Sequence, residues 1–173
     1  RDADIRGSGQ NPAQAIRDWN QGKQDVLRTG RRPVGSPTDE IYRSLLSLHL
    51  SALTVPTAVV NAFIELTSSQ HDPSDNAVST LNSMYQLLKP WGEGLGDCCR
   101  EPLTGEASWT YRAFSNTWAG PGASLASDTN QNADRLATPL VQLISTSDAN
   151  NVGQKTYWSS QQFVETVRDW IAN

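Results

Sequence analysis

The stretch SPTDEIYRSLLSLHLSAL, residues 36–53, carries the strongest pattern in the chain. Ser36 is placed to act as an N-cap, Pro37 follows in the first turn, and Asp39 lies where the dipole of a helix favours negative charge. Behind this start, apolar side chains recur at three- and four-residue intervals and leave only Arg43 and a few serines on the opposite side. The pattern predicts a central α-helix that is apolar over most of its circumference.

Helical spacing recurs along the rest of the chain, and strand-like alternation is rare. Cap-and-proline starts occur at 11–12 and 72–73, a third helix with Phe63 on its apolar face is expected after Pro56, and a last helix is expected to begin at Ser159 or Ser160. Its apolar stripe consists of Phe163, Val164, Val167, Trp170 and Ile171. We therefore expect an all-α fold, a single-domain helical bundle or orthogonal array of about six to seven helices over residues 1–173, with an extended N-terminal segment at 1–10.

Composition narrows the class of protein. Hydrophobic residues make up 37% of the chain, charged residues 18%, and the net charge is −4, which argues against nucleic-acid binding because that needs a cationic surface. The uncharged run 44–64 contains His49, Pro56 and Asn61, so we expect no transmembrane segment. The low lysine content and the start at Arg1 predict a secreted protein of microbial or fungal origin.

Both cysteines, Cys98 and Cys99, lie side by side in a glycine-rich connecting loop at 90–106. Adjacent Cα atoms are about 3.8 Å apart, below the usual range for a disulfide, so a bridge between them requires unusual peptide geometry. Three interpretations stay open: a vicinal disulfide, two thiols packed under the loop, and intermolecular or redox use. The pair lacks a second set of cysteines or histidines at ligand spacing, so no metal site is expected.

The chain has only two histidines. His49 falls near the middle of the apolar arc of the expected central helix, close to Tyr42, which predicts a buried imidazole in the core or in a pocket. His71 precedes Asp72, and that aspartate is better explained as a helix cap than as a catalytic partner. Hydrolase, nucleotide-binding and calcium-loop motifs are absent from the sequence, so no catalytic residue and no cofactor is assigned.

Six tryptophans are a high number for this length. Trp91, Trp109 and Trp158 fall in expected loops or off the helical stripes, where they would form either a buried lid or a surface that contacts a ligand. Together with His49 and Tyr42 they form the candidate ligand-binding set.

Three functional hypotheses follow from these features. The first is a non-enzymatic secreted helical protein that binds a small apolar ligand or a protein partner through an aromatic-rich core or patch. The second is a self-assembling or host-targeted interaction protein, such as an effector or coat-like subunit. The third is a small hydrolase that uses His49 or His71 with a carboxylate.

Overall fold

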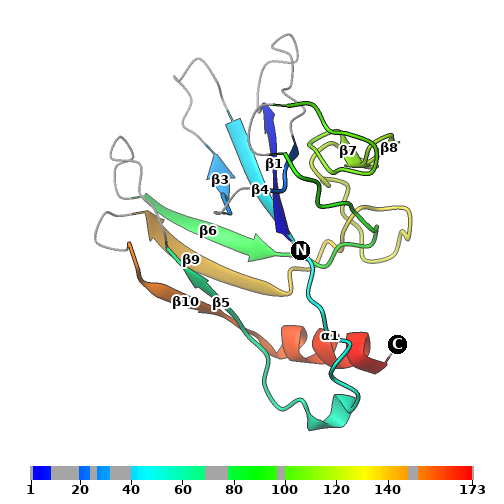
Figure 1. The fold of residues 1–173 in the computed structure, drawn as a ribbon. Coiled ribbons are helices and arrows are strands. Elements are labelled where there is room, and N and C mark those ends of the chain that lie inside the picture. The colour runs from blue at the N-terminus through cyan, green and yellow to red at the C-terminus, as the bar shows by residue number, and fades with distance from the viewer. Residues whose placement is uncertain are drawn as a thin grey trace. The chain divides into compact units, whose positions relative to one another are not determined.

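A computed structural model of the chain describes residues 2–8, 20–23, 27–31, 40–68, 78–96, 100–147 and 152–172 (Figure 1). Over these residues ten β-strands and one short 3-10 helix are followed by one α-helix. The expected all-α bundle of six to seven helices is therefore wrong. The expected central helix is wrong as well, because the described part of 36–53 contains strand β4 (Glu40–Leu46) and no helix.

The chain divides into two compact units, and each is built from two separate parts of the sequence. Unit 1 comprises Arg1–Ser47 and Gln86–Thr138, and unit 2 comprises Leu48–Tyr85 and Pro139–Asn173. Two compact units can form one domain or two separate domains. The expectation of a single domain over 1–173 therefore stays a prediction.

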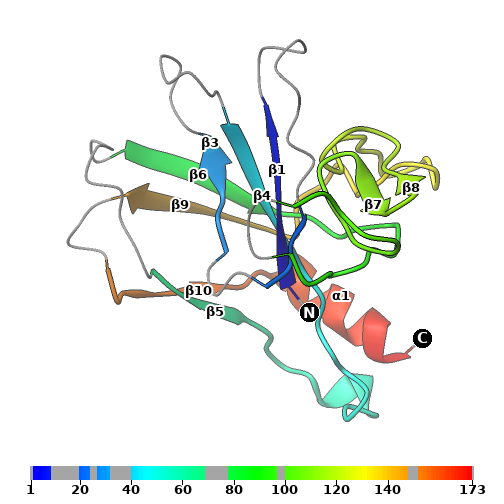
Figure 2. The same cartoon turned by 45° about the horizontal axis from the view of Figure 1, so that its top comes forward.

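Unit 1 contains a four-stranded antiparallel sheet with the order β2-β1-β4-β3. Its strands besides β4 are β1 (Asp2–Ser8), β2 (Asn20–Gln21) and β3 (Gly30–Arg31). Strand β1, from the segment expected to be merely extended, lies in the middle of the sheet beside β4 (Figure 2).

The two central strands explain why helical spacing misled the prediction. The register places Ala3 opposite Leu45 and Gly7 opposite Ile41, on one face of the sheet. Ile41 and Leu45 are four residues apart, and this spacing puts two side chains on the same face of a strand as well as of a helix. The pattern alone therefore could not separate the two structures, and pairing with β1 decides for the strand.

The remainder of unit 1 consists of long connections and one short hairpin, formed by β7 (Tyr111–Ala113) and β8 (Asn116–Thr117). These connections pack on the sheet face described above. The buried side chains of this core are Ile5, Leu45, Ala107, Trp109, Trp118 and Ala123.

Unit 2 contains two antiparallel two-stranded ribbons. Strand β5 (Ile64–Thr67) pairs with β10 (Lys155–Trp158), and β6 (Val78–Met84) pairs with β9 (Val141–Ser147) (Figure 1). The third α-helix expected after Pro56 is wrong, because this stretch forms the short 3-10 helix Pro56–Ala58 and then strand β5. Serine, threonine and β-branched residues dominate β6 and β9, and these residues favour strands over helix interiors.

The last expected helix is confirmed as α1 (Gln161–Ala172). The hydroxyl oxygen of Ser160 accepts a hydrogen bond from the backbone N–H of Phe163 at 2.9 Å, which is the geometry of an N-cap. Phe163 and Val167 are buried in the core of unit 2, with Leu140 and with Val141, the first residue of β9. Local signals sufficed here because the cap and the apolar stripe agree with the packing.

Candidate functional site

The five residues of the expected ligand-binding set are divided between the two units. Tyr42, Trp91 and Trp109 belong to unit 1, and His49 and Trp158 belong to unit 2. Whether these residues bind a ligand stays a prediction, but the surroundings of each side chain are now defined.

Trp109 is a core residue. Its side chain is only 6% exposed, and a Cβ atom placed on Gly7 would lie 2.1 Å from the indole ring. The guanidinium of Arg43 lies 5.1 Å from the ring centroid and donates a hydrogen bond to the carbonyl of Gly122, which also contacts the indole. The half-buried Trp91 packs against the same core. Both tryptophans thus pack against the core of unit 1, as the buried-lid interpretation expects.

The other members of the set differ in exposure. Tyr42 is half-buried on β4, opposite Arg6 in the ladder, and the Arg6 guanidinium lies 5.4 Å from its ring centroid. Trp158 is half-buried at the end of β10 and packs on the core of unit 2. His49 is exposed, so the expectation of a buried imidazole is wrong. The reason is that β4 ends at Leu46, and the residues after it are not helical.

The glycine-rich connecting loop owes its alternating glycines to close backbone packing. A Cβ atom on Gly92 would lie 1.6 Å from the carbonyl oxygen of Gly105, and one on Gly96 would lie 2.1 Å from the carbonyl oxygen of Asn20. Gly94 has a φ of +78°, and a Cβ atom on it would lie 2.4 Å from the side-chain amide nitrogen of Asn20. The fully buried Asn20 side chain donates to the carbonyl of Glu93 at 2.8 Å and accepts from the N–H of Gly96 at 2.7 Å.

A second anchor of this loop is the buried carboxylate of Glu106. It accepts two hydrogen bonds from the Arg100 guanidinium, at 2.6 and 2.7 Å, and others from the N–H groups of Leu95 and Leu103. The Arg100 hydrogen bonds are the main reason that the pKa of Glu106 is lowered to about 2. Cys98 and Cys99, which the chain places between Leu95 and Arg100, lie outside the described residues, as does His71.

Asp4 is a fully buried carboxylate in the centre of the sheet of unit 1. Its oxygens accept hydrogen bonds from the N–H of Arg28 at 2.9 and 3.0 Å and from the hydroxyl of Ser44 at 2.8 Å. Burial outweighs these bonds and raises the pKa of Asp4 to about 6. Gln21, its neighbour on β2, is also buried, and its side-chain nitrogen has no hydrogen-bond partner.

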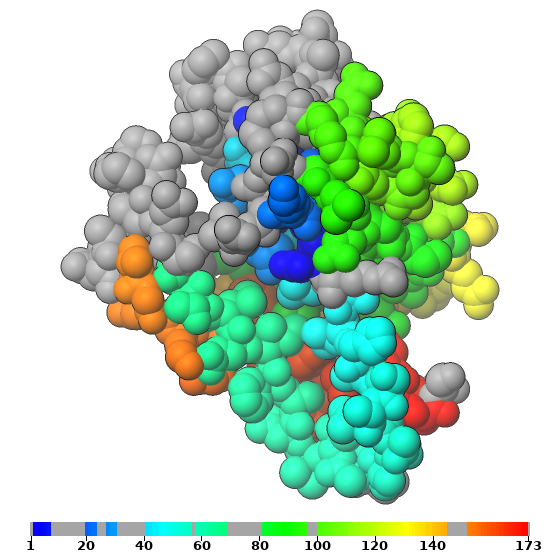
Figure 3. All heavy atoms as spheres, viewed as in Figure 1, coloured from blue at the N-terminus to red at the C-terminus, as the bar shows by residue number. Residues whose placement is uncertain are grey.

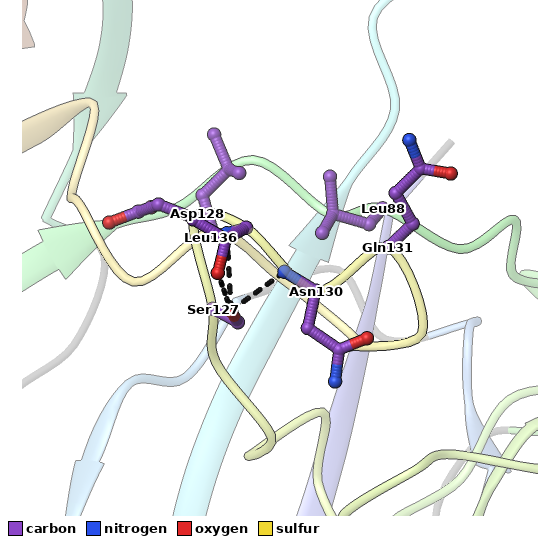
Figure 4. A pocket seen from close by; sticks show the side chains of 7 residues that line it. Leu88, Ser127, Asp128, Asn130, Gln131 and Leu136 are labelled. Carbon is purple, nitrogen blue, oxygen red and sulfur yellow. Dashed lines mark hydrogen bonds between the residues drawn. The ribbon is translucent and has the colours of Figure 1, made fainter.

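A hollow of about 450 Å³ adjoins the loop 127–131 of unit 1 (Figure 4). It is lined by Leu88, Ser127, Asp128, Thr129, Asn130, Gln131 and Leu136. The Ser127 hydroxyl accepts from the Asn130 N–H at 2.9 Å, and Asp128 accepts from the N–H of Thr138 at 2.9 Å, which holds the pKa of Asp128 below its usual value. Polar and apolar surface line this hollow in about equal parts, whereas pockets for apolar ligands are lined mostly by hydrophobic and aromatic side chains.

The outer face of the β5–β10 ribbon carries an exposed aromatic pair beside an ion pair. We call Phe63, Glu65, Lys155 and Tyr157 the β5–β10 patch. Phe63 and Tyr157 are 55% and 53% exposed, and their rings meet edge to face at 5.5 Å between centroids. The Lys155 ammonium lies 2.7 Å from a Glu65 oxygen. Strands β5 and β10 lie side by side in the space-filling view (Figure 3).

Hydrogen bonds connect the polar groups of the β5–β10 patch. The Glu65 carboxylate accepts one from Lys155 and one from Tyr157; both lower its pKa, and the bond from Lys155 has the larger effect. The bond to Glu65 in turn raises the pKa of the Tyr157 hydroxyl. The patch was not predicted, because Phe63 was expected on the face of a helix. The available signal was the alternation of apolar and polar residues in Ile64–Thr67, which is typical of a strand, but only the pairing with β10 places Glu65 opposite Tyr157.

Within the described ranges, no group of three or more His, Cys, Asp or Glu side chains is arranged to hold a metal ion. The described helices are also too short or too polar for any of them to cross a membrane. Compared with known proteins, the chain matches no family model, no curated protein and no solved structure at a significant level.

Proposed function

We propose that this protein acts without catalysis, by binding a partner protein through the β5–β10 patch. The observation that carries the proposal is the pair of exposed aromatic rings at Phe63 and Tyr157, next to the ion pair of Glu65 and Lys155. Protein interfaces are enriched in aromatic side chains at their centre and are polar at their rim. The patch has this composition on a paired and therefore ordered ribbon.

A partner protein is better supported than a small apolar ligand. The two rings lie on the outer face of a two-stranded ribbon, whereas a small apolar molecule is usually enclosed in a concave apolar pocket. The hydrolase alternative with His49 or His71 and the absence of nucleic-acid binding both stay predictions. We keep an extracellular location as part of the proposal, so the partner is sought among extracellular proteins.

The proposal is tested by comparing partners retained by variants of the complete chain. We expect a protein captured from the extracellular fraction by the unmodified chain to be lost on Phe63→Asp and on Tyr157→Asp. Each truncation of a central interface aromatic weakens binding by about 2 kcal/mol, or roughly 30-fold in Kd, and a charge weakens it further. Biolayer interferometry with the purified partner measures the change.

The matched control is Leu103→Asp, which places the same charge on an exposed apolar residue of unit 1. It should leave the affinity within twofold. Equal retention of every partner by the patch variants and the control would refute the proposal. Circular dichroism of each variant shows that the substitution at an exposed position leaves the fold intact.

A further inference from the structure

We infer that Asp4 holds a proton in this fold, and that loss of this proton moves the hydroxyl hydrogen of Ser44 from the carbonyl of Arg28 to Asp4. Asp4 and Ser44 lie opposite each other in the ladder of β1 and β4, and Arg28 contacts both. The three residues thereby form a pH-sensitive switch. This switch belongs to unit 1 alone and is independent of the proposed function.

Ser44 has too few hydrogen atoms for the contacts that it makes. Its oxygen lies 2.8 Å from Oδ1 of Asp4 and 2.9 Å from the carbonyl oxygen of Arg28. Both are hydrogen-bond distances, but a hydroxyl has one hydrogen, and an ionised carboxylate and a carbonyl are acceptors only. A proton on Asp4 supplies the second hydrogen, because Asp4 then donates to Ser44 and Ser44 donates to Arg28. Only this protonated form makes hydrogen bonds of both contacts.

The backbone N–H of Arg28 fits the protonated form as well. It lies 2.9 Å from Oδ2 and 3.0 Å from Oδ1 of Asp4, so Oδ2 can accept its hydrogen while Oδ1 carries the proton. Burial favours the same form, since Asp4 is fully buried and its pKa is raised to about 6. Both backbone groups of Arg28 are thus tied to the sheet, the N–H to β1 and the carbonyl to β4.

Loss of the proton to water leaves two acceptors for the single hydrogen of Ser44. The ionised Asp4 attracts it more strongly than the neutral carbonyl, because a hydrogen bond to a charged group is roughly twice as strong. The carbonyl of Arg28 then faces an oxygen that no longer donates to it. Arg28 is exposed, so water can replace Ser44 at this carbonyl. Near neutral pH the segment 27–31, which ends in edge strand β3, therefore loses one of its two backbone ties at Arg28.

Gln21 offers a partner to the ionised form. It lies opposite Asp4 in the ladder of β1 and β2 and is only 3% exposed. Its Oε1 lies 3.5 Å from the Arg28 guanidinium, which can only donate, and its Nε2 finds no hydrogen-bond partner in the described chain. Side chains opposite each other in a ladder start about 5 Å apart, so Nε2 can turn to an ionised Asp4. A buried donor without a partner is costly, and the ionised form removes that cost.

Other described charges modify the switch but do not replace it. Strand alternation places Asp2 and Arg6 on the same face of β1 as Asp4, with Tyr42 of β4 opposite Arg6, and β2 has no titratable side chain. Arg28 lowers the pKa of Asp4 and Asp2 raises it, and both effects are smaller than that of burial. These charges therefore shift the midpoint of the switch and leave its hydrogen count unchanged.

Carbon-13 NMR of the complete chain between pH 4 and 8 tests the switch. We expect the carboxyl carbon of Asp4 to titrate near pH 6, and the carbonyl carbon of Arg28 to shift with the same midpoint. Ser44→Ala separates the hydroxyl from the charge, because it removes the shared hydrogen and leaves Asp4 titratable. In this variant Asp4 should still titrate, and most of the Arg28 response should disappear.

Two further variants complete the test. Asp4→Asn keeps the closed arrangement at every pH, since its amide donates to Ser44 as the protonated acid does, and Arg28 should show no transition near pH 6. Asp128→Asn, at an exposed acid of unit 1, is the matched control and should leave both transitions unchanged.

An Asp4 midpoint below about pH 4.5 in the unmodified chain would overturn the inference, and this measurement needs no variant to fold. An equal Arg28 response in the unmodified chain and in Ser44→Ala would overturn it too, because the shift would then come from the charge of Asp4 and not from the hydroxyl.

Discussion

The two units differ in the polar side chains that they bury and in the apolar side chains that they expose. Six of the buried polar residues in the described chain belong to unit 1, and only Thr166 belongs to unit 2. The exposed large apolar side chains show the reverse, since three lie in unit 1 and ten in unit 2. Both units have an apolar core, but unit 1 depends in addition on buried hydrogen-bonded groups, and unit 2 leaves more apolar surface exposed.

The largest expected effect is that of Asp134→Ala in unit 1. The buried Asp134 carboxylate accepts hydrogen bonds from the N–H groups of Ala119, Gly120 and Leu125, at 2.7 to 3.3 Å. Removing it leaves these donors without a partner, and we expect the free energy of unfolding of unit 1 to fall by about 4 kcal/mol. Urea unfolding followed by tryptophan fluorescence measures this.

The matched control for that substitution is Asp128→Ala. Asp128 also accepts three hydrogen bonds, from Ala137 and Thr138, but it is exposed, so water can replace the lost acceptor. We expect a loss of less than about 1 kcal/mol. Similar losses for both variants would contradict the view that buried polar groups hold unit 1 together.

In unit 2 the corresponding test is Phe163→Ala. Phe163 is 2% exposed in the core, and its truncation should leave a cavity that lowers the free energy of unfolding by about 3 to 4 kcal/mol. Trp170, whose ring meets Phe163 edge to face at 6.4 Å, is 36% exposed. Trp170→Ala should cost clearly less, and denaturant titrations that rank the two in the opposite order would contradict this account of the core.

The third prediction is a pH dependence that belongs to unit 1. The raised pKa of Asp4, about 6 against 3.8, means that the folded state binds the proton more tightly than the unfolded state. The stabilisation, about 3 kcal/mol in full, is present below pH 3.8 and is lost as the pH rises through 6, so unit 1 should lose about 2 kcal/mol between pH 4.5 and 7.

Asp4→Asn is the control for this pH dependence, because the amide does not titrate. The difference between the two proteins in unfolding free energy should change over that pH range, and a constant difference would contradict the prediction. Glu106 contributes little there, because its lowered pKa of about 2 has the opposite effect and matters only as the pH falls below 4.5.

The smallest expected effect is that of Ser160→Ala at the start of α1. The substitution removes the cap of the Phe163 N–H, which should cost about 1 kcal/mol. Ser159→Ala serves as the neighbouring control, since its hydroxyl donates to the carbonyl of Ala62 at an exposed position. Thermal unfolding should rank Ser160→Ala as the more destabilising change.

Sequence signals located some parts of the molecule and missed the candidate site. The cap at Ser160 and the stripe of α1 were predicted correctly, because both act within one helix. The β5–β10 patch was not found, because Phe63 and Tyr157 are far apart in the chain and meet only through strand pairing. His49 was misplaced by a helical wheel that does not apply to it.

What the sequence determined by itself is the local structure of α1. Why glycine stands at 92, 94 and 96 was decided by the tertiary structure, because the groups that pack against them are distant in the chain. The tertiary structure decided the β fold. Apolar residues four apart, such as Ile41 and Leu45, suit one face of a helix and of a strand equally. Long-range pairing between β1 and β4 selected the strand, and it depends on residues about 40 positions away that no local pattern reports.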